Sequence, residues 1–258
     1  MRLHSTALFL LVGAMAWGQA VPAGTRPTLE NIVSRWTRAQ EDARAGIQPY
    51  AVTRYYELRS ESKPDKVSTV RAEVRVQPPS TKDYSIQEAK GSDGERLVRK
   101  VLEHERELAP QWEQTAFTER NYNFALDGVE MLEGHRCYVL EITPRRESKD
   151  LLRGRAWVDA EQFKLRQVVG EPAKSPSWWI KHMQVTLRYG EVQGMWLQTS
   201  TTATADVRMI GRHIFTSRNM SYSIGMAAKN TAPVAPAHAS QSGKLPIAFG
   251  TAVIVPRH

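Results

Sequence analysis

The stretch that decides the fold is Gly134-His-Arg-Cys-Tyr-Val-Leu-Glu-Ile-Thr-Pro144, followed after a charged break by Arg155-Ala-Trp-Val-Asp159 and Leu165-Arg166. In the first segment every second residue, at 138, 140 and 142, is apolar, and in the second Trp157 stands opposite Ala156 and Val158. A period of two is typical of β-strands whose two faces differ. The stretch carries a sheet signature and few residues suited to catalysis, so it predicts a binding surface.

The same alternation extends to both sides of this stretch. Strands are expected at 50–59, 70–77, 84–88, 121–126, 178–189, 195–205 and 208–224. Turn signals separate them at Lys63-Pro64-Asp65, Pro78-Pro79, Asp127-Gly128 (a hairpin or loop) and 190–194. Strands at this spacing predict a mainly β (α+β) protein with a single curved antiparallel sheet, forming a partial or full barrel.

Two amphipathic helices are expected among the strands. From Thr28 to Ala45 apolar residues recur at helical spacing, and Thr28 is suited to cap the helix. A second helix is expected from about Glu95 to Ala109, where Ser92-Asp93-Gly94-Glu95 has the spacing of a capping box. Trp178 and Trp179 are harder to accommodate, because strand alternation sends adjacent rings to opposite faces.

The two ends of the chain differ from the middle. Residues 1–20 have Arg2, an apolar run from Ala7 to Ala16 and the small residues Gly18 and Ala20, which predicts a cleaved signal peptide and a periplasmic location. The run is too short to span a bilayer, and no lipidation cysteine follows it. Residues 26–225 are expected to form one domain. The Ala/Pro-rich segment 226–258 is expected to be disordered, although its apolar part at 247–255 would also suit a strand or a partner-binding segment.

Charge and cysteine content limit the class of protein. The net charge is +8, which favours anionic partners such as a lipid surface, although a basic soluble surface without such a partner explains it equally well. Export and the lack of a helix-turn-helix or zinc-knuckle pattern argue against nucleic acid. Cys137 is the single cysteine, so no intramolecular disulfide forms.

Signals for catalysis are weak. The chain has no phosphate-binding glycine loop, nucleophile elbow or paired helical histidines. His135 and Cys137 share one strand face, but two ligands do not make a metal site, and His104, His182 and His213 are isolated. Asp159 is interpreted as a turn residue. We therefore expect no catalytic residues, metal or cofactor. The carboxylates that would have to converge in an enzyme are Glu41, Asp42, Glu57, Glu88, Asp127, Glu141 and Asp159.

The order of elements and the stretch from Gly134 to Arg166 resemble the LolA/LolB superfamily of outer-membrane lipoprotein-sorting proteins. The resemblance implies an unclosed half-barrel whose concave apolar face is covered by helices. Carried over by pattern, the lipid-binding concave face comprises Val70, Val74, Val76, Tyr84, Ile86, Tyr138, Leu140, Ile142, Val185 and Leu187, and the lid comprises Leu29, Val33, Trp36, Leu97 and Val101.

The resemblance implies a non-enzymatic exported carrier or binding protein for the acyl chain of a lipoprotein or lipid. Such a protein is expected to be a monomer, with inner- or outer-membrane proteins as further partners. Two alternatives stay open. One is a periplasmic envelope-stress sensor similar to the MucB/RseB sensor domain, which would bind an anionic lipid or the tail of a membrane protein. The other is an enzyme that uses convergent carboxylates.

Overall fold

A computed structural model describes residues 27–225; the predicted signal peptide and the tail from 226 onward lie outside this range. The helices are α1 (Leu29–Ala45), α2 (Ser92–Leu108) and the 3₁₀ helix η1 (Ala109–Gln114). The strands are β1 (Tyr50–Ser60), β2 (Lys63–Gln77), β3 (Thr81–Lys90), β4 (Tyr122–Leu132), β5 (His135–Pro144), β6 (Leu152–Asp159), β7 (Leu165–Pro172), β8 (Ile180–Val192), β9 (Met195–Val207) and β10 (Gly211–Ile224). Within the described residues, no helix is long and apolar enough to cross a membrane.

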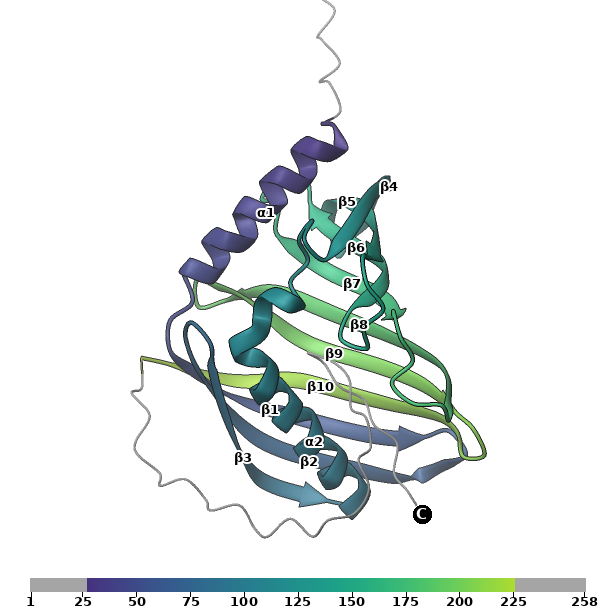
Figure 1. Ribbon diagram of the computed structural model, residues 1–258. Coiled ribbons are helices and arrows are strands. Elements are labelled where there is room, and N and C mark those ends of the chain that lie inside the picture. The colour runs from purple at the N-terminus through teal and green to yellow at the C-terminus, as the bar shows by residue number, and fades with distance from the viewer. Residues whose placement is uncertain (1–26, 226–258) are drawn as a thin grey trace, which may run out of the picture.

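All ten strands belong to one antiparallel sheet with the order β3-β2-β1-β10-β9-β8-β7-β6-β5-β4. Pairing of β1 with β10 joins the first and last strands, and Tyr50 lies opposite Ile224. The edge strands are β3 and β4, which are consecutive along the chain but are separated by α2 and η1 (Figure 1). The predicted fold class, an unclosed antiparallel half-barrel with helices on it, is confirmed.

The two faces of the sheet carry different side chains, as the alternation predicts. Tyr138, Leu140 and Ile142 on β5 lie in the main hydrophobic core. Their neighbours Cys137 and Val139 point the other way and form a second, small cluster with Trp157. Both faces of β5 are thus buried at this point, so residues of the block from Gly134 to Arg166 contribute to both hydrophobic clusters.

Two predicted turns are wrong. Lys63-Pro64-Asp65 is the beginning of β2, and the chain turns earlier, at 61–62. Asp127-Gly128 lies inside β4, where the register with β5 shifts between Leu126 and Gly128, so this glycine marks a bulge. The β4–β5 turn is formed by Glu133 and Gly134, whose φ angles of 49° and 83° suit a two-residue hairpin.

The two α-helices differ in how their first turns are capped. Thr28 caps α1 as predicted, since its side chain accepts a hydrogen bond from the Asn31 amide. The predicted capping box of α2 is wrong: Gly91 is the N-cap and no side chain caps it. A β-carbon on Gly91 would lie 2.5 Å from the Ser68 hydroxyl oxygen, and its φ is +89°. Close approach of the α2 start to β2 therefore explains this glycine.

We predict that Gly154→Ala destabilises the sheet. Gly154 on β6 faces Gly170 on β7, and an added β-carbon would lie 2.5 Å from the Gly170 Cα and closer still to the Val169 carbonyl oxygen. Backbone atoms cannot move aside cheaply, so the free energy of unfolding should fall by ~1–3 kcal/mol. Urea unfolding measures this. The matched control is Gly128→Ala, whose new methyl would meet nothing within 4 Å; equal effects of the two changes would contradict the account.

Candidate ligand-binding site

The predicted concave-face and lid residues all belong to one packed core. Most are buried and the rest pack against them at its margin. The buried ones are Val33, Trp36, Val70, Val74, Leu97, Val101, Tyr138, Leu140, Ile142, Val185 and Leu187, and the marginal ones are Leu29, Val76, Tyr84 and Ile86. Side chains from both helices therefore fill the concave face.

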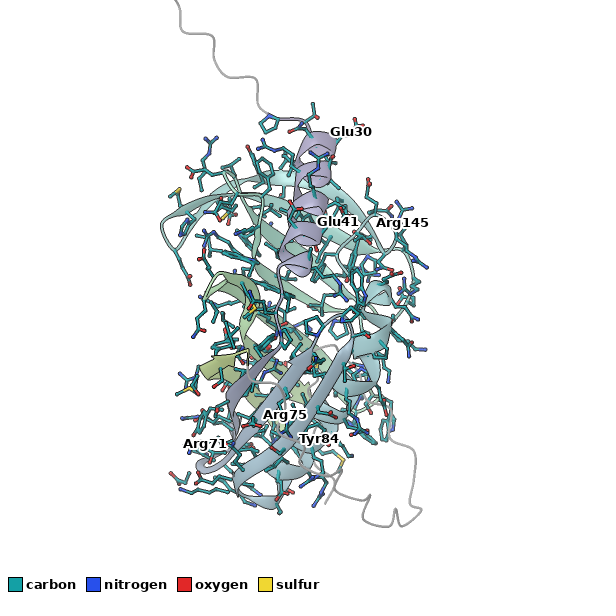
Figure 2. The ribbon with its side chains drawn as sticks, turned by 90° about the vertical axis from the view of Figure 1, so that its left-hand side faces the viewer. Glu30, Glu41, Arg71, Arg75, Tyr84 and Arg145 are labelled. Carbon is teal, nitrogen blue, oxygen red and sulfur yellow. The ribbon has the colours of Figure 1, made fainter. Side chains whose placement is uncertain are left out.

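At one margin of the core lies a cavity of about 660 Å³, between the helices and the β2–β3 turn. Figure 2 views the molecule from the side on which α1, marked by Glu30 and Glu41, leads to the strands that carry Arg75 and Tyr84. The lining comprises Glu41, Arg44 and Ala45 of α1, Ile47, Tyr50, Val76, Pro78, Pro79, Ser80, Thr81, Lys82, Ala109 and Trp112. Val76 is the predicted concave-face residue that borders it.

Arg44 ties three walls of this cavity together. Its Nη2 donates a hydrogen bond of 2.7 Å to the Pro79 carbonyl oxygen in the β2–β3 turn. Its guanidinium carbon also lies 3.4 Å from the centre of the Trp112 ring on η1. Partial burial lowers the pKa of Arg44, and the charge of nearby Glu113 offsets only part of this shift. The end of α1, the turn and η1 are thus held around one space by a single cation.

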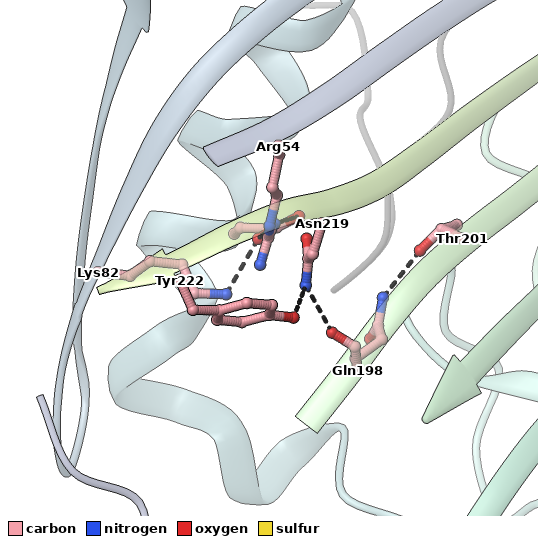
Figure 3. A network of polar contacts seen from close by, with 7 residues as sticks. Arg54, Lys82, Gln198, Thr201, Asn219 and Tyr222 are labelled. Carbon is pink, nitrogen blue, oxygen red and sulfur yellow. Dashed lines mark hydrogen bonds and ion pairs between the residues drawn. The ribbon is translucent and has the colours of Figure 1, made fainter. Parts of the chain in front are cut away.

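A buried polar network lies on the inner side of the cavity. Arg54 on β1 and Lys82 on β3 both contact the Glu105 carboxylate of α2, at 2.8 Å and 3.0 Å. Figure 3 shows a second set of polar contacts nearby, in which the Asn219 amide donates to the Tyr222 hydroxyl at 2.7 Å and to the Gln198 carbonyl at 2.8 Å. Tyr50, which lines the cavity, packs against Tyr222 with ring centres 6.1 Å apart.

The charges of this network stabilise one another. Burial alone would raise the pKa of Glu105, but the charges of Arg54 and Lys82 outweigh burial and lower it to about 2. Burial opposes the charge of Arg54, and the adjacent carboxylate raises the pKa of that guanidinium. Both groups therefore stay ionised at neutral pH. Removing one partner would leave a buried charge uncompensated.

A second contact fixes the same end of α2. His104, next to Glu105, lies 2.8 Å through its Nε2 from the Asp150 carboxylate in the segment before β6. The sequence predicts no partner for His104, and the structure pairs it with this carboxylate. Consecutive residues of α2 thus reach opposite sides of the opening between the edge strands: Glu105 contacts β1 and β3, and His104 contacts the β5–β6 connection.

The residues considered for catalysis have structural partners. Asp159 accepts hydrogen bonds from the backbone amides of Glu161 and Gln162 and from Arg166, as expected of a turn residue. Burial, with the Asp159 charge, raises the pKa of Cys137 to about 11, which favours the protonated thiol at neutral pH. Residues 27–225 contain no group of three or more His, Cys, Asp or Glu that could hold a metal ion.

The other carboxylates considered for an enzyme are spread over the molecule. Glu57 pairs with Arg59, Glu88 with Arg71 and Asp127 with Arg155. Glu41 borders the cavity.

Most of the cavity lining is not predicted from the sequence. Four of its residues come from the ends of elements rather than from an alternating run: Arg44, Tyr50, Lys82 and Trp112. The signals that were present are Pro78-Pro79, interpreted only as the end of a strand, and Trp112, a large apolar residue just after a predicted helix.

Several solved structures match this chain at low sequence identity. A LolA superfamily protein from Nitrosomonas europaea is 14% identical, covering 77% of this chain and 94% of its own, with a TM-score of 0.46. A putative outer membrane lipoprotein-sorting protein domain from Vibrio parahaemolyticus is 14% identical, covering 76% and 94%, with a TM-score of 0.47. The MucA/MucB complex from Pseudomonas aeruginosa also matches, at 12% identity, 76% and 99% coverage and a TM-score of 0.27.

One of these matching structures is described as a LolA superfamily protein, the group that the sequence resembles. A search of curated proteins gives no match. Residues 44–224 match a family described as a family of unknown function, DUF5686. This range runs from the end of α1 to the end of β10 and includes the whole sheet. The chain belongs to the DUF5686 family.

Proposed function

We propose that the protein is an exported, non-enzymatic carrier or binding protein for the acyl chain of a lipid or lipoprotein. The observation that carries this proposal is the cavity of about 660 Å³ bordered by Ile47, Val76, Pro78 and Trp112. Its volume falls within the ~300–1,000 Å³ typical of small-molecule sites. Export is proposed from the signal-like residues 1–20.

An apolar chain suits this cavity because the favourable term needs no directional contacts. Each methylene moved from water into apolar surroundings gains ~0.8 kcal/mol. Arg44 of α1 and Lys82 of β3 both line the cavity. A carboxylate or phosphate at the polar end of the ligand therefore has cations beside it. Lys82 contacts the Glu105 carboxylate as well, which connects the cavity wall to α2.

We infer that α2 acts as the lid. Its apolar face, with Leu97 and Val101, fills the concave side of β1, β2 and β3. A chain longer than the cavity has to displace this face in order to enter the core. The contacts of Glu105 and His104 at the C-terminal end of α2 oppose that movement, so they set how readily the protein opens.

We predict that Ala45→Trp blocks ligand uptake. Ala45 is an exposed residue at the end of α1 and borders the cavity, so an indole there fills the space without disturbing the core. Displacement of a fluorescent fatty-acid probe should weaken at least tenfold, which corresponds to ~1.4 kcal/mol.

The matched control is Ser34→Trp, which adds the same ring to an exposed position earlier on α1. The probe should bind this variant as it binds the unaltered protein. Equal binding by all three proteins would sink the assignment of the cavity. The absence of acyl species in protein extracted from its native envelope would count against the carrier itself and leave the sensor alternative.

We predict that the stability lost in Glu105→Gln depends on pH. The folded-state pKa of about 2 lies below the ordinary value of 4.5, so the ionised carboxylate stabilises the fold above about pH 4.5. This contribution is lost as pH falls toward 2. At pH 7 the variant should be less stable by ~3 kcal/mol, because Arg54 and Lys82 lose their common partner.

Urea unfolding of both proteins at pH 7 and pH 3 measures the effect. The difference in unfolding free energy should shrink at pH 3, and other carboxylates cancel because both proteins contain them. Release of the fatty-acid probe at pH 7 should be faster from Glu105→Gln. A stability difference of the same size at both pH values would show that the ion pair is not its source.

A further inference from the structure

Two apolar side chains project into solvent at one end of the sheet. Trp178, just before β8, is 78% exposed, and Met209, in the β9–β10 turn, is fully exposed. Arg208 brings them together: its backbone amide donates to the Trp179 carbonyl at 2.8 Å and its Nε donates to the Trp178 carbonyl at 3.1 Å. Met209 has a φ of 72°, a conformation that non-glycine residues rarely adopt. The turn therefore presents this side chain at a conformational cost.

The β1–β2 turn continues this surface. Met209 borders a second cavity of about 660 Å³, which it shares with Lys63 and Lys66 of β2 and with the apolar side chains of Leu58 and Ile210. Buried His213 also borders it and contacts the Gly211 carbonyl oxygen at 3.3 Å. The strand ends and turns that form this surface lie at the lower right of Figure 1. Trp178, Met209 and the two lysines thus lie at the same end of the sheet, and together they are here called the turn surface.

Cations outnumber carboxylates in these turns. Segments 61–66 and 206–212 together with Lys181 contain five cations, at 63, 66, 181, 208 and 212, and three carboxylates, at 61, 65 and 206. Two of the carboxylates, Glu61 and Asp206, contact Arg212 at 3.9 Å and 2.8 Å. Asp93, which borders the cavity, lies 3.9 Å from Arg96. Among the described residues, Lys63 and Lys66 have no carboxylate within ion-pair distance, so their charges are available.

We propose that the turn surface docks on an anionic phospholipid bilayer, with Trp178 and Met209 inserted at the interface and Lys63 and Lys66 at the lipid phosphates. Tryptophan is favoured at membrane–water interfaces because its ring is apolar and its indole N–H is polar. Nearby lysines and arginines are attracted to anionic headgroups. A basic surface without exposed aromatic side chains would have only the second of these terms.

Docking here is separate from ligand binding in the first cavity. Tyr50 at the start of β1 borders the first cavity, whereas Ser60 at its end borders the second. Eleven residues of strand place the two roughly 30 Å apart. A protein bound through the turn surface therefore keeps the entrance at Arg44 and Trp112 away from the headgroups that it contacts.

Labelling at position 209 tests the proposal. The sole cysteine, Cys137, is fully buried, so Met209→Cys in the full chain can be labelled selectively with a polarity-sensitive fluorophore. With vesicles of phosphatidylglycerol and phosphatidylcholine, the emission should shift to the blue. Pure phosphatidylcholine vesicles or high salt should weaken the shift severalfold, and adding Trp178→Ser should do the same.

The matched control is Met131→Cys, since Met131 is 68% exposed on the edge strand β4 and lies outside the turn surface. Its label should stay in water. The proposal is overturned if position 209 gives no shift, or if both positions shift alike, because either result means that these turns do not face the membrane. Far-ultraviolet circular dichroism of each variant verifies that the fold is intact.

Discussion

The whole structure depends on two edge strands that do not pair. β3 and β4 follow one another along the chain, yet they lie at opposite ends of the ten-strand order because α2 and η1 intervene. An unclosed sheet leaves an apolar concave face that needs a cover. The intervening helix supplies it, and α1 covers the rest by packing against β4 and β9. Trp36 of α1 is fully buried against Phe117 and Phe124.

This arrangement places polar contacts where a barrel would have its closing strand pair. Glu105 contacts Arg54 and Lys82 on one side of the opening, and His104 contacts Asp150 on the other. Side-chain contacts of this kind hold the two edges less rigidly than a ladder of backbone hydrogen bonds. The fold is thus suited to open around a ligand without any strand leaving the sheet. The cavity beside Arg44 and Trp112 lies next to this connection.

The sequence predicts the strands well because alternation is a local property. Tyr138, Leu140 and Ile142 share a buried face as expected, and Thr28 caps α1. The errors occur where a distant contact overrides a local signal. Asp127-Gly128 suits a turn but lies opposite β5 as a bulge, and the α2 start is set by Ser68 on β2 rather than by a capping box.

The candidate site was less predictable than the fold for the same reason. Arg44, Tyr50, Lys82 and Trp112 come from four elements and converge only when the sheet curls. Trp178 is exposed, as expected of a ring that is hard to bury, but it lies in the turn before β8 rather than in the strand that alternation predicts from 178. The two proposed binding surfaces therefore lie at opposite ends of β1: the first cavity lies at its start, and the turn surface lies at its end.

Hydrogen–deuterium exchange with and without palmitate tests the central claim most directly. If the acyl chain enters beside Arg44 and Trp112, added palmitate should slow exchange in three separate segments: the last turn of α1, residues 78–82, and η1. Exchange along β6 and β7, which lie away from the entrance, should stay unchanged. Unaltered exchange in all three segments, or protection elsewhere alone, would contradict the account.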